Sequence, residues 1–172
     1  MIAAGQPTRL TLAALLDLAA SRGPDRQLYR WQGADSGAAE QSCRLDELRE
    51  ASLRIAAGLA ALGVKRGDAV VLLVRNPIAL ARMWFAASRL GAFVMPLNVE
   101  LTAEALAGIV RGMDAPVIAA DLELMHLAAP LKAEAPRAAL LDLSKLPETG
   151  LSAAGGAGAI HADWNDTAMV LG

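Results

Sequence analysis

The chain has 172 residues, carries 18 acidic and 16 basic side chains, and contains one cysteine. This length fits one domain, and a net charge of −2 without a basic cluster argues against a nucleic-acid-binding surface. No apolar run approaches the roughly 20 residues of a transmembrane segment, Asp17 interrupts the candidate signal segment, and the single Cys43 excludes an internal disulfide, so we expect a cytoplasmic protein.

The first helix is expected to begin after Thr11, a good N-cap residue, and to reach Ala20, because the stop signal Gly23-Pro24 follows. Its packed face is expected to hold four apolar side chains, Leu12, Leu15, Leu16 and Ala19. Residues 28–31 and 41–44 are typical of two short antiparallel strands joined by a turn.

A longer helix is predicted from Leu45 to Leu62. Its buried face is defined by spacings of three and four residues, at Leu48, Ser52, Ile55, Leu59 and Leu62. Asp46 and Glu47 favour the positive N-terminal end of this helix, and Gly63 is expected to end it.

The centre of the chain, residues 67–98, predicts a strand, a helix and a second strand. Residues 69–74 form an unbroken apolar run, which is typical of a strand buried on both faces. Asn76 can cap a helix that begins at Pro77 and ends near Gly91, and residues 93–95 form the next apolar strand, closed by Pro96. Two strands joined by a helix lie parallel, and each face of their sheet needs a cover.

The same alternation continues through residues 102–142. We expect a helix capped by Thr102, a strand at 116–120, a helix at 122–133 interrupted by Pro130, and a strand at 138–142. The predicted fold class is therefore α/β, with a mainly parallel sheet of four or five strands and helices on both faces.

The C-terminal part has a different character. Residues 143–166 show no period and are predicted to form an exposed connector, whereas residues 167–172 are expected to begin another buried strand. We expect residues 1–172 to be one partial domain, with the helix and strand layers in residues 1–142, because the chain stops directly after an apolar strand.

Taken together, these segments resemble the N-terminal part of the adenylate-forming acyl-CoA synthetases and ligases. The resemblance rests on a series of short matches in the right order and spacing, ALGV, KRGD, VVLLV, RNP, RLGA, VMPLN and LTAEAL. It extends upstream through residues 11–31 and downstream through residues 166–172, so it covers nearly the whole chain. It implies the N-terminal subdomain of the adenylate-forming synthetase fold. Arg44 departs from the family pattern, because relatives often have a capping Ser or Thr at this place, so the start of the long helix is predicted to fray.

The resemblance also implies a function for an intact parent protein. That parent is expected to be an ATP-dependent ligase of a fatty or aryl carboxylic acid and coenzyme A, with Mg2+, forming an acyl-adenylate and then a thioester. In the family, the phosphate-binding loop, the magnesium-binding acid and the catalytic lysine follow the equivalent of Gly172, where relatives often have an aromatic residue. No catalytic, cofactor-binding or metal-binding residue is therefore assigned within residues 1–172.

The resemblance thus implies that the chain is inactive alone, binds no cofactor itself, and has the remainder of its own synthetase domain as its partner. Two alternatives stay open. The chain can be a free-standing α/β binding or regulatory module derived from such an enzyme. It can also belong to a peptide-synthetase-type adenylation domain, in which a carrier protein replaces coenzyme A as acceptor.

Several residues could in principle bind a ligand or react, but we favour a structural role for each. The glycine-rich segment 155–158 follows no predicted strand, so a linker is favoured over a phosphate-binding loop. His126 and His161 have no carboxylate or cysteine at ligand spacing, which argues against a metal site. Cys43 has no adjacent base, and a packing role is favoured over a nucleophile.

The central segment holds the remaining candidates. Trp84 and Phe85 are adjacent on one helix and must point in different directions, so one is expected to pack on the sheet and the other to reach a neighbouring domain or the acyl pocket. Asn98 follows a strand at the edge where open α/β sheets bind ligands, but capping of a loop is favoured. Arg75 and Arg82 can meet an anion such as coenzyme A, but solvated surface charge is favoured.

Overall fold

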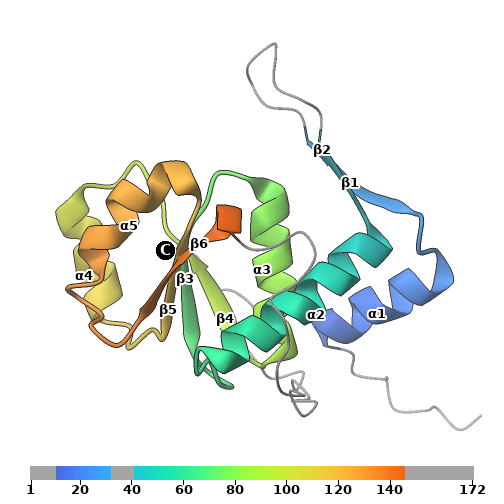
Figure 1. Cartoon of the computed structure of the whole chain (residues 1–172), viewed down its shortest axis with the longest axis horizontal. Coiled ribbons are helices and arrows are strands. Elements are labelled where there is room, and N and C mark those ends of the chain that lie inside the picture. Colours follow the sequence, from blue (N-terminus) through green and yellow to red (C-terminus); the bar gives the residue numbers. More distant parts are fainter. Residues whose placement is uncertain (1–10, 32–40, 146–172) are drawn as a thin grey trace, which may run out of the picture.

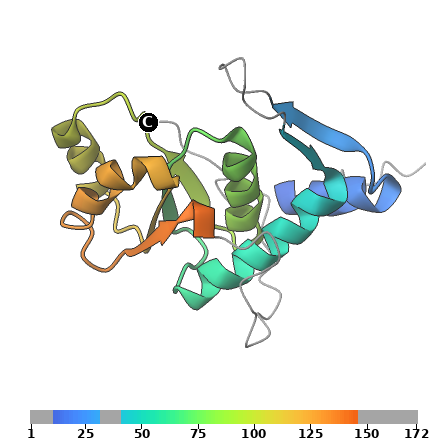
Figure 2. The same ribbon diagram turned by 45° about the horizontal axis from the view of Figure 1, so that its top comes forward.

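The computed structural model describes residues 11–31 and 41–145. Within them the chain alternates between helices and strands (Figures 1 and 2). The helices and strands are, in order, α1 (Leu12–Arg22), β1 (Gln27–Trp31), β2 (Gln41–Arg44), α2 (Leu45–Ala61), β3 (Ala69–Leu73), α3 (Pro77–Arg89), β4 (Phe93–Pro96), α4 (Ala103–Arg111), β5 (Val117–Ala120), α5 (Met125–Leu131) and β6 (Ala139–Asp142). The expected series of elements is confirmed as far as residue 142.

Four of the strands form one sheet in the order β4-β3-β5-β6, and every neighbouring pair is parallel. The chain passes from β3 through α3 to β4 on one side, and then through α4 to β5 on the other side of β3. The sheet is therefore doubly wound, and its order reverses between β3 and β5. Strands β1 and β2 form a separate antiparallel pair, as expected.

The alternation of side chains along the strands divides the core into two layers. Val70 of β3 lies in register with Val94 and Val117, and this row packs under α2 and α3. The following row, which includes Val71 and Ile118, faces the helices α4 and α5. Figure 1 shows these two helix pairs on opposite sides of the sheet. The prediction of an α/β fold with helices on both faces is confirmed.

Local signals account for the central helix α3. The Asn76 side chain accepts hydrogen bonds from the backbone N–H groups of Ile78 and Ala79 at 2.9 and 3.3 Å, and Pro77 occupies the first turn. Gly91 follows with a φ of 68°, a left-handed conformation that suits glycine. The predicted cap, start and end of this helix are all confirmed.

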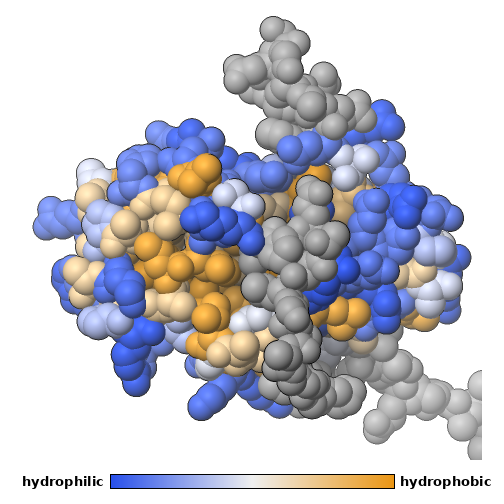
Figure 3. Space-filling view, in the orientation of Figure 1, coloured by the Kyte–Doolittle hydropathy of each residue, from blue (hydrophilic) through white to orange (hydrophobic). Residues whose placement is uncertain are grey.

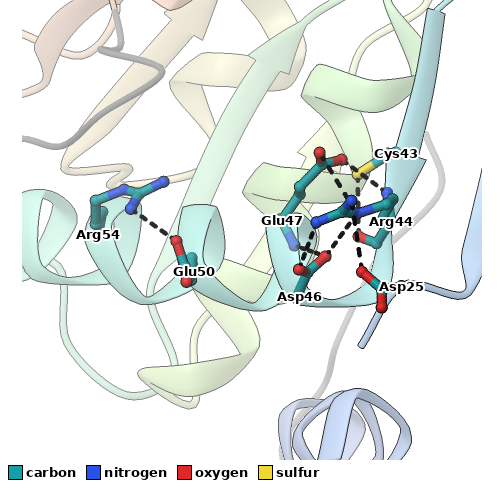
Figure 4. A network of polar contacts seen from close by, with 7 residues as sticks. All are labelled: Asp25, Cys43, Arg44, Asp46, Glu47, Glu50 and Arg54. Carbon is teal, nitrogen blue, oxygen red and sulfur yellow. Dashed lines mark hydrogen bonds and ion pairs between the residues drawn. The ribbon is translucent and has the colours of Figure 1, made fainter. Parts of the chain in front are cut away.

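Helix α2 begins at Leu45 although Arg44 has no acceptor to cap it. Acidic side chains accept the hydrogen bonds of the N–H groups at this helix end instead (Figure 4). The Arg44 N–H donates to the Glu47 carboxylate at 2.9 Å, and the Glu47 N–H donates to the Asp46 carboxylate at 2.8 Å. The Arg44 guanidinium folds onto Asp46, with Asp25 at 3.5 Å. The missing N-cap is therefore compensated by carboxylates in the first turn, which also suit the helix dipole.

Helix α1 begins after the predicted Thr11 cap, but its buried face differs from the expected one. Ala13, Leu16 and Ala20 are buried, whereas Leu15 is 47% exposed. The assignment of Leu15 to the packed face is therefore wrong. The reason is that small side chains let α1 lie close to its neighbours, and a hydropathy pattern gives more weight to leucine than to alanine.

The segment after β5 also differs in detail from the predicted helix at 122–133. A short 3-10 turn, Leu122–Leu124, precedes α5, which ends at Leu131 directly after Pro130. After β6, the expected connector starts with another 3-10 turn, and its Leu143 is buried against the α2 and α3 layer. The rest of the connector and the expected strand at 167–172 lie outside the described residues.

The surface of the described part is mixed in character. In Figure 3 apolar residues gather over the region of α5 and β6, and the side of α1 is mainly hydrophilic. Strand β6 is an edge of the sheet, and its Leu140 and Leu141 are only half-buried. Within residues 11–31 and 41–145, no helix has the length and hydropathy needed to cross a bilayer.

Candidate functional site

The candidate site lies at the carboxyl edge of the sheet, between β3 and β5. Open α/β sheets place their ligands where the strand order reverses, because the loops after the two strands diverge there. In this chain the loops are residues 74–76, after β3, and residues 121–122, after β5. The loop after β4, residues 97–101, lies along the same edge because the strands are parallel.

At this point of strand reversal, a carboxylate of the chain itself occupies the backbone N–H groups that a ligand could otherwise bind. Asp121 Oδ2 accepts hydrogen bonds from the backbone N–H groups of Arg75 at 2.7 Å and Asn76 at 3.1 Å. The Asp121 N–H in turn donates to the Leu73 carbonyl oxygen at 3.0 Å. The Asn76 side-chain amide, which caps α3, also donates to Gln41 Oε1 at 3.2 Å. The loops after β3 and β5 are thus joined by one acidic side chain.

Two candidates predicted from the sequence, Asn98 on the loop after β4 and Arg75 on the loop after β3, have partners on the loop after β4. Asn98 Oδ1 accepts a hydrogen bond from the Glu100 N–H at 3.0 Å, which is the loop-capping geometry favoured for this residue. The Arg75 guanidinium lies 3.5 Å from the Glu100 carboxylate, and both side chains are exposed. The Arg75 cation at this edge is therefore already paired with an acid.

This arrangement does not fit a nucleotide phosphate at the point of strand reversal. A phosphate there would need free N–H groups and a cation. The N–H groups of Arg75 and Asn76 are taken by Asp121, whose negative charge would repel a second anion, and the Arg75 guanidinium is paired with Glu100. We therefore assign no phosphate contact to this edge.

Cys43 has the properties of a packing residue. It is 2% exposed and lies in a small cluster with Leu16, Leu45 and Leu48. Burial raises the pKa of the thiol, and this effect outweighs the opposing influence of the Arg82 guanidinium. A neutral buried thiol is a poor nucleophile. The Nε of Arg82 is buried and has no hydrogen-bond partner within residues 11–31 and 41–145, so Arg82 is not simply a solvated surface charge.

Trp84 and Phe85 point to different layers, as their adjacent positions require. The half-buried Trp84 packs against the cluster formed by the sheet, α2 and α3, whereas Phe85 packs against the cluster around α1. Their ring centroids are 6.5 Å apart at an interplanar angle of 39°. The favoured interpretation as core residues agrees with these contacts, and the buried Trp84 N–H has no acceptor among the described residues.

The remaining candidates do not come together. His126 is exposed, and its Nδ1 lies 2.8 Å from the Glu123 carbonyl oxygen of its own turn. Within the part of the chain that the structure describes, no three His, Cys, Asp or Glu side chains are grouped to hold a metal ion. His161, the glycine-rich segment 155–158 and Gly172 lie outside the described residues.

Two polar groups that link distant segments were not predicted from the sequence. One is Asp121, which follows a strand directly and could have been singled out by that position. The other is Asp17 on α1, which receives a bidentate hydrogen bond from Arg89 on α3 at 2.7 and 3.0 Å. The Arg89 guanidinium holds the pKa of this carboxyl below its usual value. No local spacing pairs residues that are 72 positions apart.

Known proteins are similar to this chain in sequence and in fold. A family model described as AMP-binding enzyme matches residues 16–170. A 2-succinylbenzoate–CoA ligase of Geobacillus sp. (strain WCH70) is 35% identical over 78 residues, which are 45% of this chain and 16% of that relative. The matched stretch therefore covers well under a fifth of the length of that relative.

Two solved structures show the same architecture. The fatty acyl-adenylate ligase from L. pneumophila, in complex with acyl adenylate and pyrophosphate, aligns with a TM-score of 0.73 and 18% identity over 92% of this chain and 27% of that one. The N-terminal domain of FACL13 from Mycobacterium tuberculosis aligns with a TM-score of 0.69 and 19% identity over 94% of this chain and 41% of that one. With the family match over residues 16–170, they show that this chain belongs to the AMP-binding enzymes and has the fold of the N-terminal part of an adenylate-forming ligase.

Proposed function

We propose that this chain is part of an ATP-dependent ligase that joins a fatty or aryl carboxylic acid to coenzyme A. The observation that carries the proposal is the family match over residues 16–170, which is supported by the doubly wound sheet. The printed names of the relatives agree, because they include 2-succinylbenzoate, butyrate, long-chain fatty acid and 4-coumarate CoA ligases.

The proposed reaction has two steps. The carboxylate of the acid attacks the α-phosphorus of ATP, which forms an acyl-adenylate and releases pyrophosphate. The thiol of coenzyme A then attacks the acyl carbon, which forms the thioester and releases AMP. Mg2+ would balance the charge of the triphosphate when it is bound.

We further propose that residues 11–31 and 41–145 have a structural role in this reaction and supply no phosphate ligand. The support is the closed point of strand reversal, where Asp121 occupies the N–H groups of Arg75 and Asn76. These residues build one sheet with its helices and present it to the remainder of the synthetase domain. The 172-residue chain alone is accordingly expected to make no adenylate.

The test compares the natural gene product, purified from its source cells, with the 172-residue chain. Each is incubated with labelled pyrophosphate, ATP, Mg2+ and a panel of aliphatic and aryl acids, and acid-dependent ATP–pyrophosphate exchange is measured. We expect exchange and thioester formation with the natural product if it is a larger protein, and none with the 172-residue chain. Exchange by the 172-residue chain would contradict the proposed structural role. The absence of exchange by a larger natural product would contradict the proposal that it is a ligase.

Two further measurements complete the proposal. Replacing coenzyme A by a phosphopantetheine-bearing carrier protein in the second step distinguishes the acceptors, and we expect transfer to coenzyme A. Cell fractionation followed by detection of the protein tests the proposed cytoplasmic location. Recovery in a membrane fraction would contradict that location.

A further inference from the structure

Helix α1 is attached to the rest of the fold at its C-terminal end. The turn at residues 23–26 follows it, and two carbonyl oxygens of this turn cap the next helix: the Leu45 N–H donates to Arg26 at 3.1 Å and the Asp46 N–H donates to Pro24 at 3.2 Å. These bonds satisfy N–H groups that a helix N-terminus would otherwise leave free. The turn is thereby fixed to α2, and α1 extends from it across α2 and α3.

One acidic side chain holds the middle of α1 against both helices. Asp17 receives the bidentate hydrogen bond of Arg89 from α3 and lies 3.2 Å from the Arg49 Nε of α2. The Arg89 Nε also donates to the Ser52 hydroxyl at 2.8 Å. The Arg89 side chain is only 11% exposed, so its charge depends on Asp17 for compensation.

The apolar contact beneath α1 is a cluster separate from the two layers on the sheet, in which Leu16 and Ala20 lie with Cys43, Leu45, Leu48 and Ile78. The residues that α1 buries are two alanines and one leucine: Ala13, Leu16 and Ala20. Leu15 and Leu18, which are three positions apart on its other side, are 47% and 37% exposed and add little to the docked state. The strands β3 and β5, in contrast, are buried along their whole length. The apolar core therefore stabilises the sheet far more than it stabilises the position of α1.

We propose that α1 is a hinged flap, which pivots at residues 23–26, is latched by Asp17 between Arg49 and Arg89, and opens while the four-stranded sheet stays folded. Opening removes Asp17 from the seam between α2 and α3. It frees the buried Arg89 guanidinium and the half-exposed Arg49 guanidinium from their shared carboxylate, and two such cations suit an anion. Opening also uncovers the apolar cluster that Leu16 shares with Cys43, Leu45, Leu48 and Ile78. The latch thus controls access to a cationic seam on the face of the fold opposite α4 and α5.

Amide hydrogen exchange of the 172-residue chain, read by mass spectrometry or NMR, tests this proposal. In the parent chain, the amides of α1 should exchange faster than those of β3 and β5. In Asp17→Ala, exchange of α1 should rise about tenfold, which is the effect expected for losing hydrogen bonds to a charged group, whereas β3 and β5 should change less than about twofold. Alanine is the better helix former, so a lower helix propensity cannot cause the rise.

The matched control is Glu134→Ala, which removes the carboxylate partner of Arg111 at 2.7 Å on the other side of the sheet. It should leave the exchange of α1 unchanged. Asp17→Asn keeps the shape of the side chain and one acceptor, and should give an intermediate rate. Salt at about 1 M should speed the exchange of α1 in the parent chain but not in Asp17→Ala.

Two results would overturn the proposal. If Asp17→Ala leaves the exchange of α1 within about twofold of the parent rate, Asp17 is not a latch. If α1, β3 and β5 of the parent chain exchange through one common opening, α1 is not a separable flap. Circular dichroism of each variant shows whether the sheet is retained, so that a global loss of structure is recognised.

Discussion

The carboxylate of Asp121 offers a direct test of how the two central loops are held. In Asp121→Ala, the N–H groups of Arg75 and Asn76 lose their acceptor, which lies at 2.7 and 3.1 Å in the parent chain. Hydrogen bonds to charged groups contribute roughly 1.5–3 kcal/mol each. Arg75 is exposed, and water can replace part of the interaction there. We therefore expect a loss of about 2 kcal/mol in the free energy of unfolding.

The measurement is urea denaturation followed by circular dichroism, together with thermal unfolding. At this chain length, about 2 kcal/mol corresponds to a decrease in Tm of roughly 4–8 °C. Asp121→Asn keeps one acceptor and should lose about half as much. Glu123→Ala is the matched control, because its side chain is exposed two positions further along, and it should stay within about 0.5 kcal/mol of the parent. An Asp121→Ala chain that also stays within this range would refute the reasoning.

Three other changes have definite expected outcomes. Asn76→Ala removes the cap of α3 and should lower the free energy of unfolding in urea by about 1 kcal/mol; no change would show that Gln41 or water compensates. Met83→Ala empties a fully buried position and should cost about 2–5 kcal/mol, seen as a lower Tm, whereas a smaller loss would mean that the alanine-rich layer collapses into the cavity. Arg89 lowers the pKa of Asp17. The resulting stabilisation should be complete above the unfolded pKa of 3.8 and disappear as the pH falls through the lower folded pKa. In urea titrations, the stability difference between the parent and Asp17→Asn should therefore shrink with acidification and not grow.

The positions of the helices and strands depend largely on neighbouring residues, so the sequence alone determined them. Thr11, Asn76 and Thr102 each accept hydrogen bonds from N–H groups two or three positions further along. The start of each helix is therefore determined by residues within one helical turn. The unbroken apolar run of β3 likewise predicted a strand buried on both faces. The family resemblance rests on the same local segments, which is why it could be stated before the strand order was known.

Only the tertiary structure decided how the elements meet. Asp121 reaches Arg75 and Asn76 across 46 and 45 positions, and the reversal of strand order that brings them together has no local signature. The exposure of Leu15 and the burial of Ala13 depend on how closely α1 approaches its neighbours, which hydropathy does not record. The sequence by itself thus determined where the chain forms helices and strands, because caps and apolar runs act within a few residues. The closed carboxyl edge and the Asp17 latch arise from contacts between segments that only folding brings into range.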